Sequence, residues 1–196
     1  MYNENRINAI IKLNKNQIVS GDKDGFLKIW DIKSGECKSI YFYIYKNAPA
    51  NISKLNRTQL ISGDTDGSVK IWDLNSEYCL KSFIGHDDEV ISVCKLSNTK
   101  FASVGSEYTI KIWDIPTQKC LRDLLGHYYI ISCIIGLNSK LIASGSKDST
   151  IKVWDITTGD CMKTFCGKFG FNFLVKINRY QIISNGYENV IQIWDL

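Results

Sequence analysis

The dipeptide Trp-Asp recurs along the whole chain at nearly constant intervals, and this recurrence constrains the fold more than any other feature. All five tryptophans take part, at Trp30, Trp72, Trp113, Trp154 and Trp194, so that successive copies lie 42, 41, 41 and 40 residues apart. A period of this length indicates a repeat protein, in which one unit cannot bury its own apolar face and must pack against its neighbours. We therefore predict a single domain, residues 1–196, made of five units at about 1–43, 44–84, 85–125, 126–166 and 167–196.

Within each unit the pattern of residues is that of strands and turns. Apolar runs of four to eight residues, rich in Ile, Val, Phe and Tyr, are separated by Gly, Asp, Asn and Ser, which is typical of short β-strands joined by turns. No segment has the period and the caps of a helix. The fourth unit is the clearest, and its predicted strands are Ile130–Leu137, Lys140–Gly145, Thr150–Asp155 and Cys161–Phe165.

Four short antiparallel strands in a unit of about forty residues describe one blade of a propeller. The third strand of each unit ends in Trp-Asp, and Gly85-His86 and Gly126-His127 stand before the first strand of units three and four. These residues resemble the WD40 repeat family, and the resemblance covers essentially the whole chain. It implies an all-β fold, a WD40-type β-propeller of five blade units.

Serine, histidine and acidic residues recur at fixed distances before the tryptophans. A serine lies ten residues before every tryptophan, an acidic residue lies six before, and a histidine lies twenty-seven before in two units. The two sets are His127, Ser144, Asp148 and Trp154, and His86, Ser103, Glu107 and Trp113. They admit two interpretations: a catalytic triad, or a hydrogen-bonded network like the structural tetrad of WD40 blades. Repetition favours the network, because a fold constraint is needed in every unit and a catalytic site only once.

The tetrad is complete only in the fourth unit. The histidine position holds Asn3 in the first unit and Tyr45 in the second, while the fifth is one residue short and has Gly167-Lys168 in place of Gly-His. Glu107 adds a methylene where Asp148 stands in unit four. We therefore expect blade four to be the firmest and blades one, two and five to depend more on packing.

The fifth blade is predicted to lack its outer strand. The sequence stops directly after the third strand of unit five, at Trp194-Asp195-Leu196, and only Met1 and Tyr2 precede the histidine position of unit one. Three arrangements follow: a closed ring with one three-stranded blade, an open arc with exposed edges, or part of a larger propeller completed by another chain or a second copy. The missing strand favours the arc or a nearly closed ring.

Charge and cysteine usage point to an ordinary globular protein. The net charge is +4 with scattered lysines, which indicates solubility more than a polyanion partner. No signal peptide or membrane span is recognised, so we expect a cytoplasmic or, alternatively, nuclear protein.

Four cysteines each lie seven residues after a tryptophan, at Cys37, Cys79, Cys120 and Cys161. They are interpreted as small buried side chains. No zinc spacing or cofactor motif is present, and Asp-Gly turns such as Asp24-Gly25 are interpreted as hairpin turns instead of calcium loops, so no metal or cofactor is predicted.

The predicted function is that of a non-enzymatic scaffold for protein–protein interaction. The resemblance implies that peptides or proteins contact the rim formed by the turns between second and third strands and the loops before first strands. Carried onto this chain, the candidate contacts are Lys23, Lys46, Thr65, Asp87, Glu89, Ser106, Tyr128, Lys147, Phe169 and Tyr187. The alternatives are an RNA-, DNA- or chromatin-associated protein, and a fragment of a larger propeller such as a ubiquitin-ligase substrate receptor. Self-association through open blade edges is a further expectation; a small-molecule substrate and a membrane partner are not expected.

Overall fold

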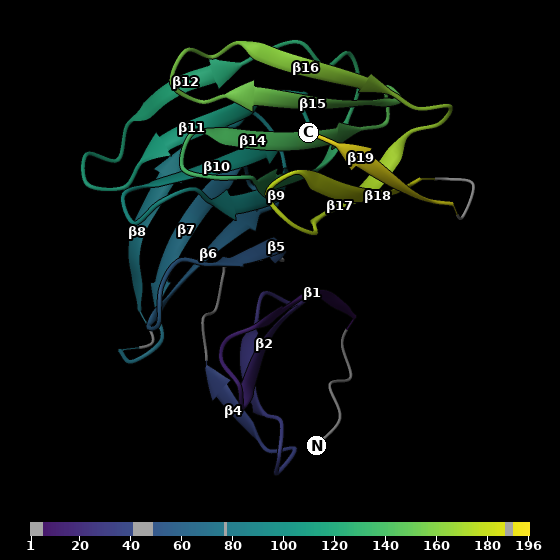
Figure 1. Ribbon diagram of the computed structural model, residues 1–196. Helices are drawn as coiled ribbons and strands as arrows, with labels where there is room; N and C mark the ends of the chain where they lie inside the picture. Colours follow the sequence, from purple (N-terminus) through teal and green to yellow (C-terminus); the bar gives the residue numbers. More distant parts are fainter. Residues whose placement is uncertain (1–5, 41–48, 77, 187–189) are drawn as a thin grey trace. The chain divides into compact units, whose positions relative to one another are not determined.

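The chain is built from strands and turns (Figure 1). The computed structural model describes residues 6–40, 49–76, 78–186 and 190–196, and no helix occurs among them. Accordingly, this described part contains no apolar helix of the length needed to cross a membrane. The chain divides into two compact parts, here called the N-terminal half (Met1–Val93) and the C-terminal half (Cys94–Leu196), and each is described by itself.

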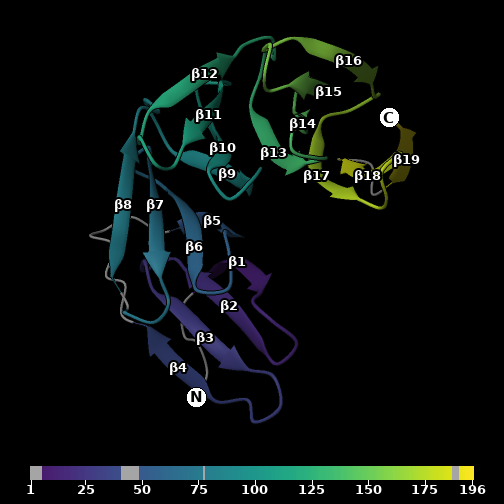
Figure 2. The same cartoon turned by 60° about the vertical axis from the view of Figure 1, so that its left-hand side comes forward.

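The strands form five antiparallel sheets, and each sheet corresponds to one repeat. In the first four sheets the strands follow one another in chain order, and Figure 2 shows this for β1 to β4. The first two sheets contain β1 (Ile7–Lys12), β2 (Gln17–Asp22), β3 (Leu27–Asp31) and β4 (Cys37–Ile40), then β5 (Pro49–Lys54), β6 (Gln59–Asp64), β7 (Ser68–Asp73) and β8 (Cys79–Ile84). The third and fourth contain β9 (Val90–Lys95), β10 (Lys100–Gly105), β11 (Ile110–Asp114) and β12 (Cys120–Leu124), then β13 (Ile131–Gly136), β14 (Leu141–Ser146), β15 (Thr150–Asp155) and β16 (Cys161–Cys166). The fifth contains β17 (Phe171–Lys176), β18 (Gln181–Gly186) and β19 (Ile191–Asp195).

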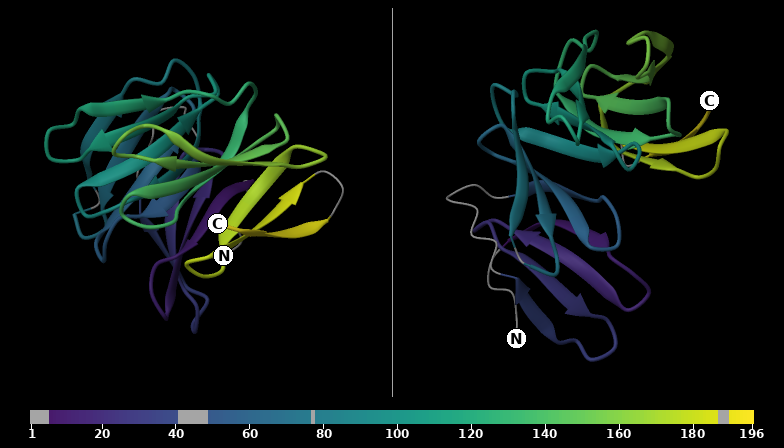
Figure 3. Two further views of the ribbon diagram at one scale, coloured as in Figure 1. Left: turned by 45° about the horizontal axis from the view of Figure 1, so that its top comes forward. Right: turned by 90° about the vertical axis from the view of Figure 1, so that its left-hand side faces the viewer.

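Successive sheets of the N-terminal half pack face to face. Leu27 and Ile29 of β3 lie on one face of the first sheet because alternate residues of a strand share a face. They join Leu60 and Trp72 of the second sheet in one buried apolar cluster. In the right-hand view of Figure 3 the purple first sheet lies next to the blue second sheet. Trp72 therefore helps to cover the preceding sheet.

The C-terminal half repeats the same packing twice. Ile110 and Ile112 of β11 cluster with Trp154 of the fourth sheet. Ile151 and Val153 of β15 in turn lie in a cluster that Trp194 of the fifth sheet packs against. Burial of these side chains is the main source of stability, at roughly 25 cal/mol for each Å² of apolar surface removed from water. In each of these three pairs of sheets, an aliphatic pair from one sheet and a tryptophan from the next thus build the core between them.

The turn between second and third strands needs a residue with positive φ in every repeat where it is described. Gly25 and Gly67 take this position with φ of 87° and 80°, as the Asp-Gly pairs predict. In the third and fourth repeats the same position holds Tyr108 and Ser149, with φ of 65° and 67°. A bulky residue in this region is uncommon because its Cβ crowds the backbone. Tyr108 is therefore held in a conformation that the sequence alone does not predict.

The aspartate of Trp-Asp closes the next turn of the blade. Asp155 accepts hydrogen bonds from the backbone N–H groups of Thr157 at 2.7 Å and Thr158 at 3.3 Å through Oδ1. These bonds, the one from Thr157 above all, hold the pKa of Asp155 below its usual range. Asp31 accepts from Lys33 and Ser34 in the same way. A side chain that binds its own backbone in this manner fixes a tight turn, which explains why the aspartate accompanies the tryptophan.

The all-β fold built from propeller blades is confirmed, and the fifth sheet has three strands as predicted. The strands predicted in the fourth repeat agree with β13 to β16 to within one residue at each end. The division of residues 1–196 into one domain, and the way in which the blades close, remain predictions.

The interpretation of the repeated cysteines as buried side chains is wrong. Cys79, Cys120 and Cys161 are exposed and Cys37 is half-buried. They stand at the start of outer strands, where consecutive residues on both faces are exposed, as in β12 and β16. The Cys79 Sγ donates to the backbone carbonyl of Lys81. The strand cysteines Cys94 and Cys133 are the buried ones, and burial raises the pKa of each thiol to about 12.

Candidate functional site

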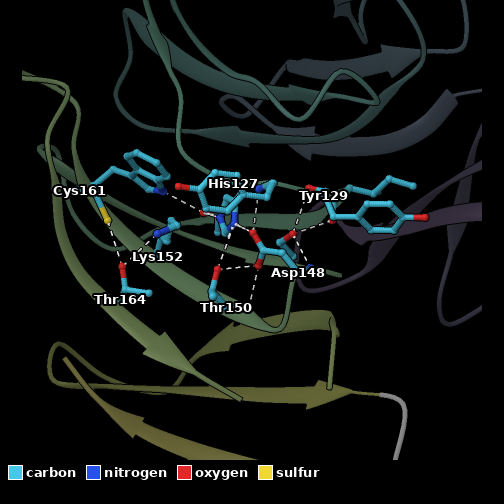
Figure 4. A network of polar contacts seen from close by, with 12 residues as sticks. His127, Tyr129, Asp148, Thr150, Lys152, Cys161 and Thr164 are labelled. Carbon is cyan, nitrogen blue, oxygen red and sulfur yellow. Dashed lines mark hydrogen bonds and ion pairs between the residues drawn. The ribbon is translucent and has the colours of Figure 1, made fainter. Parts of the chain in front are cut away.

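The fourth repeat brings a tryptophan, a serine, a histidine and an aspartate into one line of hydrogen bonds (Figure 4). The Trp154 indole N–H donates to the Ser144 Oγ at 2.8 Å. The same oxygen lies 2.7 Å from Nε2 of His127, whose Nδ1 lies 2.7 Å from the Asp148 Oδ2. Because a carboxylate accepts only, Nδ1 carries the proton, and Nε2 accepts from the serine hydroxyl.

Strand register explains how the sequence brings these groups together. Ser144 on β14 lies opposite Lys152 on β15, and Trp154 is two residues further along the same face. Asp148 stands in the turn that joins the two strands. His127 lies in the loop before β13, so the network ties this loop to the β14–β15 hairpin.

Asp148 also fixes the backbone on both sides of the network. Its Oδ2 accepts from the Tyr128 N–H at 3.1 Å, and its Oδ1 accepts from the Thr150 N–H at 2.8 Å and the Thr150 hydroxyl at 2.6 Å. Burial opposes the charge on this carboxylate, but the hydrogen bonds from Thr150, His127 and Tyr128 outweigh it and lower the pKa of Asp148. One charged group therefore holds the loop before β13 and the turn after β14.

The histidine is kept neutral. Burial lowers the pKa of His127, and this effect exceeds the opposing influence of the Asp148 carboxylate. The imidazole side chain is fully buried and lies against the Trp154 ring with centroids 5.9 Å apart. A neutral, buried histidine with both nitrogens engaged is suited to holding structure.

The geometry also bears on the alternative interpretation as a triad. Ser144 is 0% exposed, and its oxygen already accepts from the indole while its proton is directed at His127. A nucleophile needs an open approach for the atom that it attacks, and this hydroxyl is enclosed between two strands. The arrangement favours the network.

The tryptophan–serine bond is present in every repeat. The distance between the indole nitrogen and the serine oxygen is 2.8 Å for Trp30 and Ser20, 2.9 Å for Trp72 and Ser62, 2.7 Å for Trp113 and Ser103, and 2.8 Å for both Trp154 and Ser144 and Trp194 and Ser184. Because the indole N–H can only donate, a buried tryptophan requires such an acceptor. This bond is the common element of all five blades.

The second repeat satisfies its serine with an aspartate that sequence reasoning missed. The Ser62 hydroxyl accepts from Trp72 and donates to the Asp64 Oδ1 at 3.0 Å. Asp64 is fully buried and forms an ion pair with Lys70 through Oδ2. Burial raises the pKa of Asp64, and the Lys70 ammonium counteracts this. In the second repeat Asp64, paired with Lys70, thus accepts from the serine hydroxyl, as His127 does in the fourth.

The first repeat has the same pair. Asp22 is fully buried, and its Oδ2 faces the Lys28 ammonium at 3.3 Å. Aspartate stands eight residues before the tryptophan in repeats one and two, whereas the other three have Gly105, Ser146 and Gly186 there. These are the two repeats without Gly-His or Gly-Lys before the first strand. The signal in the sequence was therefore an aspartate eight residues before the tryptophan in the repeats that lack these dipeptides.

Of the second predicted tetrad, His86, Ser103, Glu107 and Trp113, the bond between the tryptophan and the serine is present. Ser103 and Trp113 are hydrogen-bonded, as described above, and the Glu107 side chain folds back over Gly105. His86 is buried in the loop before β9. His86 belongs to the N-terminal half, while Ser103, Glu107 and Trp113 belong to the C-terminal half.

The comparison with protein families decides what these blades are. The WD domain, G-beta repeat, matches residues 4–31, 46–73, 77–114 and 118–155, more than half of the chain. The chain belongs to the WD40 family. The match at 118–155 contains the complete WD40 network of the fourth repeat, while residues 167–196 lie outside the matched ranges. A comparison with curated proteins found no match.

The predicted partner contacts of this WD40 chain lie on the turns and loops, and most are open to solvent. Lys23, Thr65 and Asp87 are exposed in the N-terminal half, and Glu89 is half-buried there. Tyr128, Lys147 and Phe169 are exposed in the C-terminal half, and Ser106 is half-buried. Lys46 and Tyr187, like Asn3 and Tyr45 of the tetrad positions, fall outside the described residues. Among those described, no group of three or more His, Cys, Asp and Glu could hold a metal ion.

Sequence reasoning missed the aromatic residues that lie beside these contacts. Tyr108 and Tyr129 stack with ring centroids 5.8 Å apart. Tyr108 replaces the glycine of an Asp-Gly turn, and Tyr129 stands next to the predicted Tyr128. The signal available was the pair Tyr128-Tyr129 directly after Gly126-His127, since no other repeat has two tyrosines there.

Proposed function

We propose that the chain is a non-enzymatic WD40 interaction module, and that a protein or peptide binds its exposed turns. Propellers of this family commonly act as protein-interaction scaffolds. A binding surface of this kind needs loops carried on a rigid framework. The fourth repeat supplies both, because the network that holds its strands also holds the loop before β13.

The observation that carries the proposal is a group of exposed side chains on adjoining turns of the C-terminal half. We call it the turn surface, and it consists of the exposed Tyr128, Tyr129, Lys147, Lys168 and Phe169 together with the half-buried Tyr108. Tyr128 is 86% exposed, Tyr129 is 50% exposed and Phe169 is 40% exposed. Aromatic residues are enriched where proteins bind one another, because they bury a large area at small entropic cost. Three exposed aromatic side chains on neighbouring turns therefore favour a surface that binds a partner.

The proposal is tested by photo-crosslinking at a single position. A photoreactive phenylalanine analogue replaces Tyr128 in one variant and Tyr180 in a control variant. Tyr180 is also exposed, but it lies in the β17–β18 loop at the other end of its hairpin. In a lysate of the cells that produce the protein, we expect adducts from position 128 that protease removes and nuclease does not. Equal adducts from both positions, or adducts that only nuclease removes, would contradict the proposal.

A further inference from the structure

The parts of the turn surface are in direct contact with one another. The rings of Tyr108 and Tyr129 stack, which joins the turn after β10 to the loop before β13. The Ser146 hydroxyl donates to the backbone carbonyl of Tyr129 at 3.1 Å, and the Lys147 N–H donates to that of Ile130 at 2.8 Å. These bonds join the same loop to the turn after β14.

The loop before β17 completes the surface. A Cβ added to Gly170 would lie 2.8 Å from the Lys147 Cα, so the backbone at Gly170 lies against the Lys147 turn with no room for a side chain. This close approach places the loop that carries Lys168 and Phe169 beside the turn that carries Lys147. The Lys168 ammonium itself lies 5.7 Å from the centre of the Phe169 ring. Loops and turns from three successive sheets therefore form one continuous surface.

The surface is held before any partner arrives. The Asp148 carboxylate accepts from the Tyr128 N–H and from His127, so the network beneath fixes the loop that carries both tyrosines. Figure 4 shows the Tyr129 ring extending away from this network. Order that exists before binding reduces the entropy lost on association.

The charges of the turn surface are arranged with cations outward and anions inward. Lys147 and Lys168 are exposed. Among the residues that the structure describes, the acids on these turns point away from solvent: the Asp148 side chain is 8% exposed and accepts bonds from His127, Tyr128 and Thr150, and the Glu107 side chain folds over Gly105. A partner that approaches these turns therefore meets ammonium groups beside aromatic rings.

The distribution of charge along the chain points the same way. The C-terminal half contains twelve Lys and Arg and eight Asp and Glu, whereas the N-terminal half contains twelve of each. The whole net charge of +4 thus comes from the half that carries the turn surface. Such an imbalance attracts an anionic partner at long range and raises its rate of association.

Resting on the proposed function, we infer that the turn surface binds an acidic peptide segment that carries an apolar or aromatic side chain. The apolar side chain packs among Tyr128, Tyr129 and Phe169. The acidic side chains pair with Lys147 and Lys168. Tyr108 stacks on Tyr129 and holds that ring in place.

The test uses fluorescence anisotropy with four labelled probes. They are a short Glu-rich peptide with a central Leu-Phe pair, the same peptide with Ala-Ala at its centre, a Lys-rich peptide with Leu-Phe, and oligothymidine of similar length. We expect the first probe to bind at least about tenfold more tightly than the other three. Its affinity should fall as salt is added, because exposed charges are screened.

Matched variants locate the binding. Lys147→Glu with Lys168→Glu, and separately Tyr128→Ala with Phe169→Ala, should each weaken the first probe about tenfold. The controls are Lys140→Glu with Arg179→Glu, and Tyr180→Ala, which make the same changes in exposed loops at the other ends of the hairpins. These controls should leave the affinity unchanged, and all variants should keep the circular dichroism spectrum of the original chain.

The outcomes separate this inference from the proposed function. Tighter binding of the Lys-rich peptide, equal binding of the Ala-Ala peptide, or no binding of any peptide overturns the inference, while protein adducts from position 128 leave the proposed function standing. If oligothymidine binds more tightly than the first peptide, and the turn-surface variants abolish this binding, the inference is overturned. If position 128 also gives adducts that only nuclease removes, the proposed function is overturned as well.

Discussion

Removing the imidazole of His127 tests whether the buried network stabilises the fourth blade. In His127→Ala the Ser144 hydroxyl loses its acceptor and the Asp148 carboxylate loses one of its donors. A neutral hydrogen bond contributes about 1 kcal/mol, and one to a charged group contributes about 1.5–3 kcal/mol. Tyr128 and Thr150 still donate to Asp148, so the lower end applies there, and we expect a loss of about 2–3 kcal/mol.

The loss is measured as a shift of the urea midpoint and of the melting temperature, followed by circular dichroism. For a chain of this size, about 2–4 °C accompanies each kcal/mol, which predicts a decrease of roughly 4–12 °C. The neighbouring substitution Tyr128→Ala removes a highly exposed side chain and should change stability by less than about 0.5 kcal/mol.

A double-mutant cycle isolates the interaction itself. Asp148→Asn keeps the shape of the side chain and removes its charge, and in combination with His127→Ala it should cost less than the two single changes together. Residues in one hydrogen-bonded network couple by about 0.5–3 kcal/mol. Additive effects, or a His127→Ala protein that melts with the original chain, would refute the network as a source of stability.

Three further predictions concern pH, the buried ion pair and the fifth blade. Because burial lowers the pKa of folded His127, the unfolded chain binds a proton that the folded chain does not, so stability should fall as pH drops below about 6.5. His127→Ala should remove this slope in urea titrations at several pH values, and a rise of stability on acidification would show that Asp148 controls the imidazole instead. Lys70→Met leaves the buried Asp64 carboxylate without its ion-pair partner and should lower the free energy of unfolding by about 3 kcal/mol at neutral pH. This loss should become smaller in acid as Asp64 is protonated, since burial already raises the pKa of Asp64. Its matched control, Lys111→Met, frees an Asp123 side chain that is 46% exposed and should cost below about 1 kcal/mol. Trp154→Ala should lower the free energy of unfolding by about 3–5 kcal/mol. Trp194→Ala should lower it less, because Trp154 is 1% exposed while Trp194 is only half-buried. Equal losses for the two variants in urea titrations would contradict this order.

The fold could be predicted from the sequence because it depends on features that recur. The position of each tryptophan, the serine ten residues earlier and the aliphatic pair of the third strand repeat in every unit, and each follows from one physical need. The indole needs an acceptor, and the aliphatic residues need the neighbouring sheet. The network of His127, Ser144, Asp148 and Trp154 lies where this periodicity places it.

The remaining features depend on differences between repeats. Asp64 and Lys70 complete a network in which histidine is absent, but spacing alone does not reveal that this aspartate is buried. The cysteines at the start of the outer strands are exposed or half-buried because little packs on these strands there. Their regular spacing does not reveal this, since a repeated position can be buried or exposed. The stack of Tyr108 on Tyr129 joins two loops whose approach depends on how sheets pack.

Native-state hydrogen exchange followed by mass spectrometry tests the central claim most directly, namely that the Ser-His-Asp-Trp constellation is a scaffold that makes the fourth blade the firmest. The backbone amides of β14 and β15 should exchange more slowly than those of β18 and β19, because exchange reports local opening. In His127→Ala the amides of β14, β15 and the Tyr128 loop should exchange faster, while those of β18 and β19 should be unchanged. Equal protection of the two hairpins in the original chain, or no local acceleration in the variant, would contradict the account.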